Sequence, residues 1–232
     1  MKERGMIFNG DMVRAILEGR KTVTRRPVKD SSGYTKVSKC ASPYDEFILI
    51  KEGKIPGSGS GIKIKSPHGT IGDRLYVRET MYVDGYLDVH YSADHVIAEC
   101  EELADWDYRE PEYVGSIPSI HMPKFAARIW LEITDVRVER VQDINPSEVL
   151  SEGIRIEVPR GIDPSPFPDD FSHWSEEKRE AWIDSQARAT YLTRCNYESG
   201  LIDAFRSLWD SIYENWKENP WVWVIEFKRI DR

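Results

Sequence analysis

The stretch Ile16-Leu17-Glu18-Gly19-Arg20-Lys21-Thr22-Val23-Thr24-Arg25-Arg26 joins the end of a helix to the start of a strand. Met12 recurs with Ile16 and Leu17 at helical spacing, and Gly19 supplies a helix stop. Beyond the glycine, the β-branched residues in 22–24 favour an extended chain, which Pro27 ends. The stretch therefore predicts a short helix followed at once by a strand with the basic side chains Arg20, Lys21, Arg25 and Arg26.

Apolar patterns on both sides of this stretch predict further strands. Residues 6–8 form a short apolar run, and residues 71–79 combine a turn with alternating apolar side chains. Residues 81–91 are the candidate partner of that second strand. Near-alternation over residues 126–141 predicts a long, half-buried strand. In the closing segment 220–227, alternate side chains would face opposite sides of a sheet, which separates the tryptophans and Phe227 from the valines.

Helix signals occur in three later segments. Residues 143–153 have an Asn/Pro/Ser start and a glycine stop, which are typical of a short helix. Residues 176–194 predict a polar, solvent-facing helix. Residues 201–216 repeat apolar side chains at three- and four-residue steps, so this helix must pack on an apolar surface.

The chain is expected to form one α+β domain over residues 1–232. Strands near both ends with helices between them favour a closed small sheet over a doubly wound parallel one. Two segments interrupt the pattern as candidate insertions, 28–70 and 155–200. The first is rich in Gly, Ser, Lys and Pro around one possible hairpin at 47–50, and the second contains a proline-rich loop at 159–170.

The charge distribution restricts how the protein could bind nucleic acid. A net charge of −8 argues against non-specific coating of nucleic acid, which depends on many Lys and Arg neutralising phosphates. A local basic cleft at residues 20–26 remains compatible with that total, because the acid is concentrated at 99–112 and 163–184. The basic patch either attracts an anionic ligand or forms an ordinary solvated face.

Cysteine use and hydropathy favour a cytoplasmic protein without a metal or other cofactor. Cys40, Cys100 and Cys195 are odd in number and far apart, which predicts free thiols. His90 and His95 are close in sequence and leave a metal pair as the minor alternative. No apolar run is long enough to cross a membrane, and the N-terminus lacks a signal-peptide core.

Several separated segments together resemble the ASCH family, a branch of the PUA-like RNA-binding β-barrels. The family pattern Gly-x-Lys-x-x-x-x-Arg is met by Gly19, Lys21 and Arg26. Segments 72–79, 141–154, 205–213 and 219–223 are similar, in order, to a longer phage and prophage version of the domain. The resemblance covers roughly two thirds of the chain and implies a small closed β-barrel with flanking helices and two insertions.

The resemblance also implies a catalytic set. Some small bacterial ASCH proteins are amidohydrolases that convert N4-acetylcytidine to cytidine and acetate with a lysine, a threonine and a glutamate. These residues correspond to Lys21, Thr24 and Glu152 here. A threonine hydroxyl needs an adjacent base, which Lys21 could provide after losing a proton, and a carboxylate can carry a proton to the leaving amine. On a straight strand Lys21 and Thr24 would face opposite sides, so a shared site requires a bend between them.

Other side chains are candidates for binding the substrate. These are Arg20, Arg25, Arg26, the carboxylate Glu79, and the aromatic Tyr76 as a stacking surface for a base. The expected partner is a modified nucleoside or RNA, and the oligomeric state stays open. The alternatives are a non-catalytic RNA- or nucleotide-binding module, a ribonuclease using the same cleft, or a structural role in phage assembly. In isolation, Thr24 is a common strand residue, Lys21 a surface lysine and Glu152 a solvated helix residue.

Overall fold

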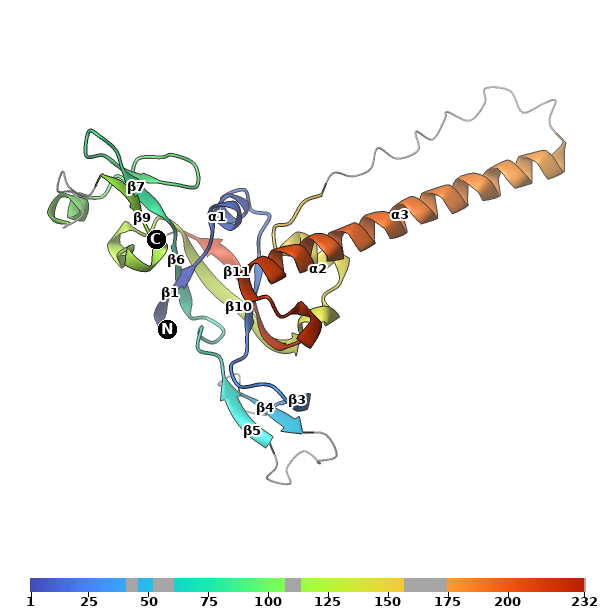
Figure 1. The fold of residues 1–232 in the computed structure, drawn as a ribbon, viewed down its shortest axis with the longest axis horizontal. Helices are drawn as coiled ribbons and strands as arrows, with labels where there is room; N and C mark the ends of the chain where they lie inside the picture. Colours follow the sequence, from blue (N-terminus) through green and yellow to red (C-terminus); the bar gives the residue numbers. More distant parts are fainter. Residues whose placement is uncertain (41–45, 52–60, 107–113, 157–174, 232) are drawn as a thin grey trace.

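The computed structural model describes residues 1–40, 46–51, 61–106, 114–156 and 175–231, which form a mixed α+β fold (Figure 1). At its centre is a five-stranded sheet with the order β1-β6-β10-β11-β2. Strands β1 and β6 are parallel, and the other neighbours are antiparallel. The predicted α+β class is confirmed. The strands are β1 (Glu3–Ile7), β2 (Val23–Pro27), β6 (Arg74–Arg78), β10 (Trp130–Arg140) and β11 (Trp221–Ile230).

The edges of this sheet are β1 and β2. In the described part of the chain, no backbone pairing joins these two strands. A side chain spans the gap instead, because the Arg26 guanidinium on β2 donates to the Ile7 carbonyl oxygen on β1 at 2.8 Å. The edge strands are therefore close enough for one arginine to link them.

Strand β11 separates two apolar cores, as its alternation predicts. Trp223 and Ile225 pack in the core that also contains helix α1 (Gly10–Leu17). Val222 and Val224 pack on the opposite face, in the core formed with α2 (Pro146–Ser151) and α3 (Glu176–Tyr213). Burial of apolar surface on both faces is the main force that holds the sheet and helices together.

The two short helices begin at capping asparagines. The Asn9 side chain accepts a hydrogen bond from the Met12 N–H at 2.9 Å at the start of α1. Asn145 and Glu148 form a reciprocal capping box at the start of α2. Both helices are confirmed, and both end beside Lys21, just before β2. Lys21 pairs with Glu152 in an isolated antiparallel bridge, and its N–H donates to the Ala15 carbonyl oxygen of α1.

The two helices predicted near the C-terminus are one continuous helix. Helix α3 runs for 38 residues, and its N-terminal half extends away from the sheet (Figure 1). The segment between the two predicted helices has no proline, and the helix tolerates Gly200 at a cost of about 1 kcal/mol relative to alanine. The predicted loop at 159–170 lies outside the described residues.

The candidate insertion 28–70 contains more structure than one hairpin. Strands β3 (Tyr34–Lys39), β4 (Glu46–Lys51) and β5 (Gly61–Lys65) form an antiparallel sheet of their own. Phe47 on β4 packs edge-on against Trp223 at 5.6 Å between ring centroids. The prediction of a hairpin at 47–50 is therefore wrong, because these residues lie within the single strand β4, which contributes side chains to the core.

Segment 81–91 is not the partner of β6. It forms β7 (Met81–Val83) and β8 (Val89–Tyr91), which pair with β9 (Gly115–Ile117) in a separate three-stranded sheet. This sheet buries its own apolar cluster. Strand β6 instead pairs with β1 and β10, because its Leu75 and Val77 belong to the central core.

Candidate functional site

A buried ion pair joins Lys21 to Glu152. The Lys21 ammonium donates to Glu152 Oε2 at 2.6 Å, and the exposed fractions of the two side chains are 0% and 4%. It also donates to the carbonyl oxygens of Glu152 at 2.9 Å and Val23 at 2.8 Å. The three N–H groups of the ammonium are thus satisfied. The structure brings together two of the three residues predicted to be catalytic.

Close packing at the end of α2 positions this pair. Glu152 is the C-cap of α2, and Gly153 follows with a φ of +87°. A Cβ at Gly153 would lie 2.7 Å from the Ala15 Cβ and 3.0 Å from the Lys21 Cβ. Glycine is therefore required here both by the backbone conformation and by the approach of α1.

The electrostatics of the pair are those of a desolvated site. Burial lowers the pKa of Lys21 below its ordinary value, and the neighbouring Glu152 carboxylate opposes this effect. The nearby cations Arg26 and Arg25 lower the pKa of Lys21 further. A proton on Lys21 is therefore easier to remove than one on a surface lysine, and Glu152 is the carboxylate beside it.

Thr24 lies on β2 opposite Ile225, so its side chain shares the sheet face of that core residue. It is fully buried, and its hydroxyl has no hydrogen-bond partner. The chain is irregular just before it, because the Thr22 N–H donates to the Ser151 carbonyl oxygen rather than to β11. The Thr24 hydroxyl is not among the partners of the Lys21 ammonium, so β2 carries the predicted nucleophile beside the ion pair without a direct contact.

Arg25 is inside the fold and not on a binding surface. Its guanidinium lies 3.3 Å from Glu152, 3.0 Å from Glu148 and 3.5 Å from Glu139. The contact with Glu152 has hydrogen-bond geometry, whereas Nη2, which faces the other two carboxylates, has no hydrogen-bond partner. Arg25 therefore acts on Glu152 and not on solvent, which differs from its predicted role in substrate binding.

A wider ion network surrounds Arg25. Arg137 donates to Glu139 at 2.5 Å and to Glu148 at 2.7 Å, and it also pairs with Glu226. These residues come from β10, β11 and α2, so the network ties the helix that ends in Glu152 to the sheet. Sequence reasoning missed this network, although Glu148 could have been found as the capping-box residue of α2.

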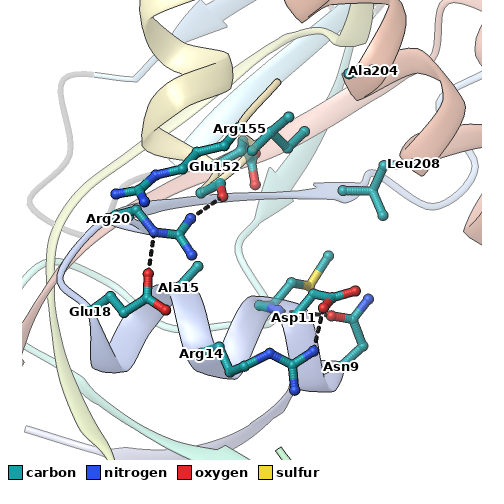
Figure 2. Close-up of a pocket in the computed structure, with 13 residues that line it drawn as sticks. Asn9, Asp11, Arg14, Ala15, Glu18, Arg20, Glu152, Arg155, Ala204 and Leu208 are labelled. Atoms are coloured by element: carbon teal, nitrogen blue, oxygen red, sulfur yellow. Dashed lines mark hydrogen bonds and ion pairs between the residues drawn. The ribbon is translucent and has the colours of Figure 1, made fainter. Parts of the chain in front are cut away.

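Arg20 lines a cavity of about 380 Å³ between α1 and the segment after α2 (Figure 2). It donates to Glu18 at 2.5 Å and to the Gly153 carbonyl oxygen at 2.5 Å. Arg14 and Arg155 also line the cavity, and Arg14 is paired with Asp11. The cavity thus has a mixed charge, and Glu152 reaches its wall.

Arg26 points to a second cavity, of about 430 Å³. Its guanidinium lies over the Phe8 ring at 5.4 Å, and the Lys21 ammonium lies over the same ring at 6.0 Å. A small cavity of about 20 Å³ has both Arg26 and Glu152 in its lining. Arg26, like Arg20, is therefore a predicted binding residue that lies close to the ion pair and lines a cavity.

Glu79 and Tyr76 are not brought to this site. Glu79 is buried and accepts two hydrogen bonds from Arg128, at 2.9 and 2.8 Å. Burial raises the pKa of Glu79, and Arg128 opposes that effect. Tyr76 packs against Trp130 at 5.8 Å, beside the core of the β7 sheet. Both residues have structural partners in place of the predicted ligand contacts.

Further features of the chain bear on the kind of site it could hold. Cys40 and Cys100 are free thiols. None of the described helices is long and apolar enough to cross a membrane. Across the same described ranges, no group of three or more His, Cys, Asp or Glu side chains is arranged to hold a metal ion. Comparisons with protein-family models, with curated proteins and with solved structures gave no match.

Proposed function

We propose that this protein is an amidohydrolase that removes an N-acyl group from a modified cytidine, with N4-acetylcytidine as the reference substrate. The observation that supports it most directly is the buried Lys21–Glu152 pair, with its atoms 2.6 Å apart. Lysine and glutamate rarely occur buried together without a reason that offsets their desolvation. A proton relay beside a nucleophile is such a reason.

The proposed chemistry begins with a proton transfer inside the pair. Lys21 passes a proton to Glu152, and the desolvated site favours the resulting neutral amine and acid. The amine then takes the proton of the Thr24 hydroxyl as its oxygen bonds to the acyl carbon. The bond from that carbon to N4 of cytosine breaks, and Glu152 supplies the proton that N4 needs to leave as an amine. Water then cleaves the acyl-threonine ester, which releases acetate.

Access to Thr24 is part of this proposal, because its hydroxyl is buried and unpartnered. An unpartnered buried hydroxyl costs free energy, which a substrate carbonyl or a local opening would recover. Arg26 would orient the substrate from the neighbouring cavity.

The same proposal places the chain in the ASCH family, with a PUA-like barrel. The edge strands β1 and β2 would form the barrel seam, and the Arg26 contact with the Ile7 carbonyl oxygen supports this arrangement. The sheet faces two cores, one of which is enclosed by α1 and by β4. The candidate insertions would then be additions to one small barrel.

A non-catalytic module that binds a modified nucleotide or RNA is the second candidate. It is favoured by the saturated Lys21 ammonium, whose three acceptors are all protein atoms. In this case the ion pair stabilises the fold, and Arg26 meets the ligand. Thr24→Val would then leave binding intact, whereas Arg26→Gln would weaken it.

The test is incubation of purified protein with N4-acetylcytidine, followed by chromatography for cytidine. Thr24→Val removes the hydroxyl but keeps the β-branched shape, and Thr22→Val makes the same change at an exposed neighbouring position. Formation of cytidine by the wild type and by Thr22→Val, but not by Thr24→Val, would support the hydrolase. The absence of cytidine at high enzyme concentration would contradict the hydrolase and favour the non-catalytic binding module.

A further inference from the structure

The cavity beside Arg26 lies at the gap between the two edge strands of the central sheet. Its volume is about 430 Å³, which is within the range of small-molecule sites. Its wall is formed by β1, α1, β2, β6, the end of α3 and the loop that contains His68. The polar residues that matter for its chemistry are Arg26, His68 and Arg78.

Two of these residues carry positive charge, and their described hydrogen-bond acceptors are carbonyl oxygens. Arg26 donates to the carbonyl oxygens of Ile7 and Arg25, and Arg78 donates to that of Ile120. Across the described ranges, neither guanidinium forms an ion pair with an acid, whereas Arg25, Arg128 and Arg137 each do. The cavity therefore has a local positive charge on a chain that is acidic overall.

His68 is affected mainly by its burial and also by nearby charge. Burial, together with the neighbouring Arg26 and Arg4, lowers the pKa of His68 to about 4. Its imidazole is therefore neutral near pH 7, when it can donate one hydrogen bond and accept another. Its ring has no hydrogen-bond partner among the described residues, which leaves that capacity for a ligand.

The rest of the wall is apolar. Ile7 and Ile212 are 42% and 46% exposed, and Met6, Met12 and Tyr213 lie with them. A flat apolar group could rest on this part of the wall while an anion meets the guanidinium groups. A nucleotide has this combination of a base and a phosphate.

We propose that this cavity binds a nucleotide through its phosphate group, with Arg26 and Arg78 as the cationic partners and His68 as a neutral hydrogen-bonding partner. The phosphate part of the inference stands on the cavity alone, whereas the identity of the base as cytosine rests on the proposed function. The small cavity that borders Glu152 shares Met12, Arg26, Ile212 and Tyr213 with this one, so the two adjoin. A phosphorylated nucleoside is then expected to bind at the ion pair more tightly than the free nucleoside.

Calorimetric titration of the full chain with cytidine 5′-monophosphate and with cytidine tests this inference. We expect the monophosphate to bind roughly tenfold more tightly or better, because charge-assisted hydrogen bonds to phosphate are strong. Arg78→Gln is expected to abolish the preference. Arg229→Gln removes an equal charge from an exposed position on β11 and is expected to retain it. A short oligocytidylate that competes with the monophosphate identifies RNA as the source of the phosphate, and a lack of competition identifies the mononucleotide.

A second measurement applies to the wild type in case Arg78→Gln fails to fold. Bound phosphate would raise the pKa of His68 from about 4, which NMR of the imidazole can follow with His68→Gln for assignment. Equal affinities for the two ligands, a preference that persists in Arg78→Gln, or an unchanged His68 titration would each overturn the inference. Phosphate preference without hydrolysis contradicts only the proposed function, and hydrolysis without phosphate preference contradicts only this inference.

Discussion

Replacement of Glu152 by glutamine isolates the energetic role of the buried ion pair. The substitution keeps the shape of the side chain and removes its negative charge. Arg25 retains Glu148 at 3.0 Å and Glu139 at 3.5 Å, whereas Glu152 is the only acidic partner of Lys21 among the residues that the structure describes. The uncompensated charge in Glu152→Gln is therefore the ammonium of Lys21. Breaking a buried pair by removing one partner costs about 3 to 5 kcal/mol of unfolding free energy.

The pH dependence of this loss follows from the ability of Lys21 to shed its proton. A lysine with the ordinary pKa of 10.5 loses its proton near pH 7 at a cost of about 5 kcal/mol, at about 1.4 kcal/mol per pH unit. The cost of removing this proton is the largest loss of unfolding free energy that Glu152→Gln can cause, and it falls to about 1.4 kcal/mol near pH 9.5. Burial lowers the folded pKa of Lys21, so the unfolded chain binds more protons in the window below 10.5 and stability rises with pH there. Loss of Glu152 lowers that pKa further and extends the window to lower pH.

Guanidinium denaturation followed by tryptophan fluorescence, near pH 7 and near pH 9.5, measures both effects. The control is Glu132→Gln, which removes the acid of a partly exposed pair with Lys228 at 3.0 Å and is expected to cost less than about 1 kcal/mol. The reasoning is refuted if Glu152→Gln loses no more than the control near pH 7. It is also refuted if the loss caused by Glu152→Gln is as large near pH 9.5 as near pH 7.

Three further outcomes are expected. Gly153→Ala is expected to lower the free energy of unfolding by about 1 to 2 kcal/mol because of its φ of +87°, and by about 1 to 3 kcal/mol more because of the contacts of the new methyl group. Gly19→Ala has open space around it and is expected to lose only the backbone part. Chemical denaturation of the two variants measures the difference. Asn145→Ala is expected to lose about 1 kcal/mol of stability with the capping box of α2, measured in the same way. Asp84→Asn is expected to lower the pKa of His90 in an NMR titration, because the 2.9 Å contact with Asp84 raises that pKa. The contact stabilises the fold fully at pH values below the ordinary pKa of His90, and this stabilisation is lost as the pH rises through the raised pKa of the folded state.

Local signals were sufficient for much of the secondary structure. The asparagine caps and glycine stops predicted α1 and α2, and the alternation in the last strand predicted which of its side chains share a face. These features depend on residues a few positions apart, which the periodicities of helices and strands record. The predicted break in α3 was wrong because a polar segment without proline can continue a helix that packs at its other end.

The roles of neighbouring basic residues depended on packing. Alternation on β2 implies that Arg25 and Arg26 face opposite sides of the sheet. The sequence does not say which of these sides is covered by α2 and α3 and which side borders a cavity. Glu79 was a candidate for substrate binding because it is a carboxylate in one of the matched segments. In the fold it pairs instead with Arg128, which is far away in the sequence. His68 had no recognisable signal in the sequence, because it lies in the candidate insertion 28–70, away from the matched motifs.

The pairing of Lys21 with Glu152 shows both contributions. Both residues were expected from the proposed resemblance of short motifs, which rests on residue types and spacing alone. The 2.6 Å contact, the full burial of the ammonium and the third ion partner Arg25 depend on how α2 docks against β2 over a separation of 131 residues. A charge buried in this way has a different pKa and a different energetic cost from the same charge in water, so the chemistry of the pair comes from the fold around it and not from its sequence neighbours.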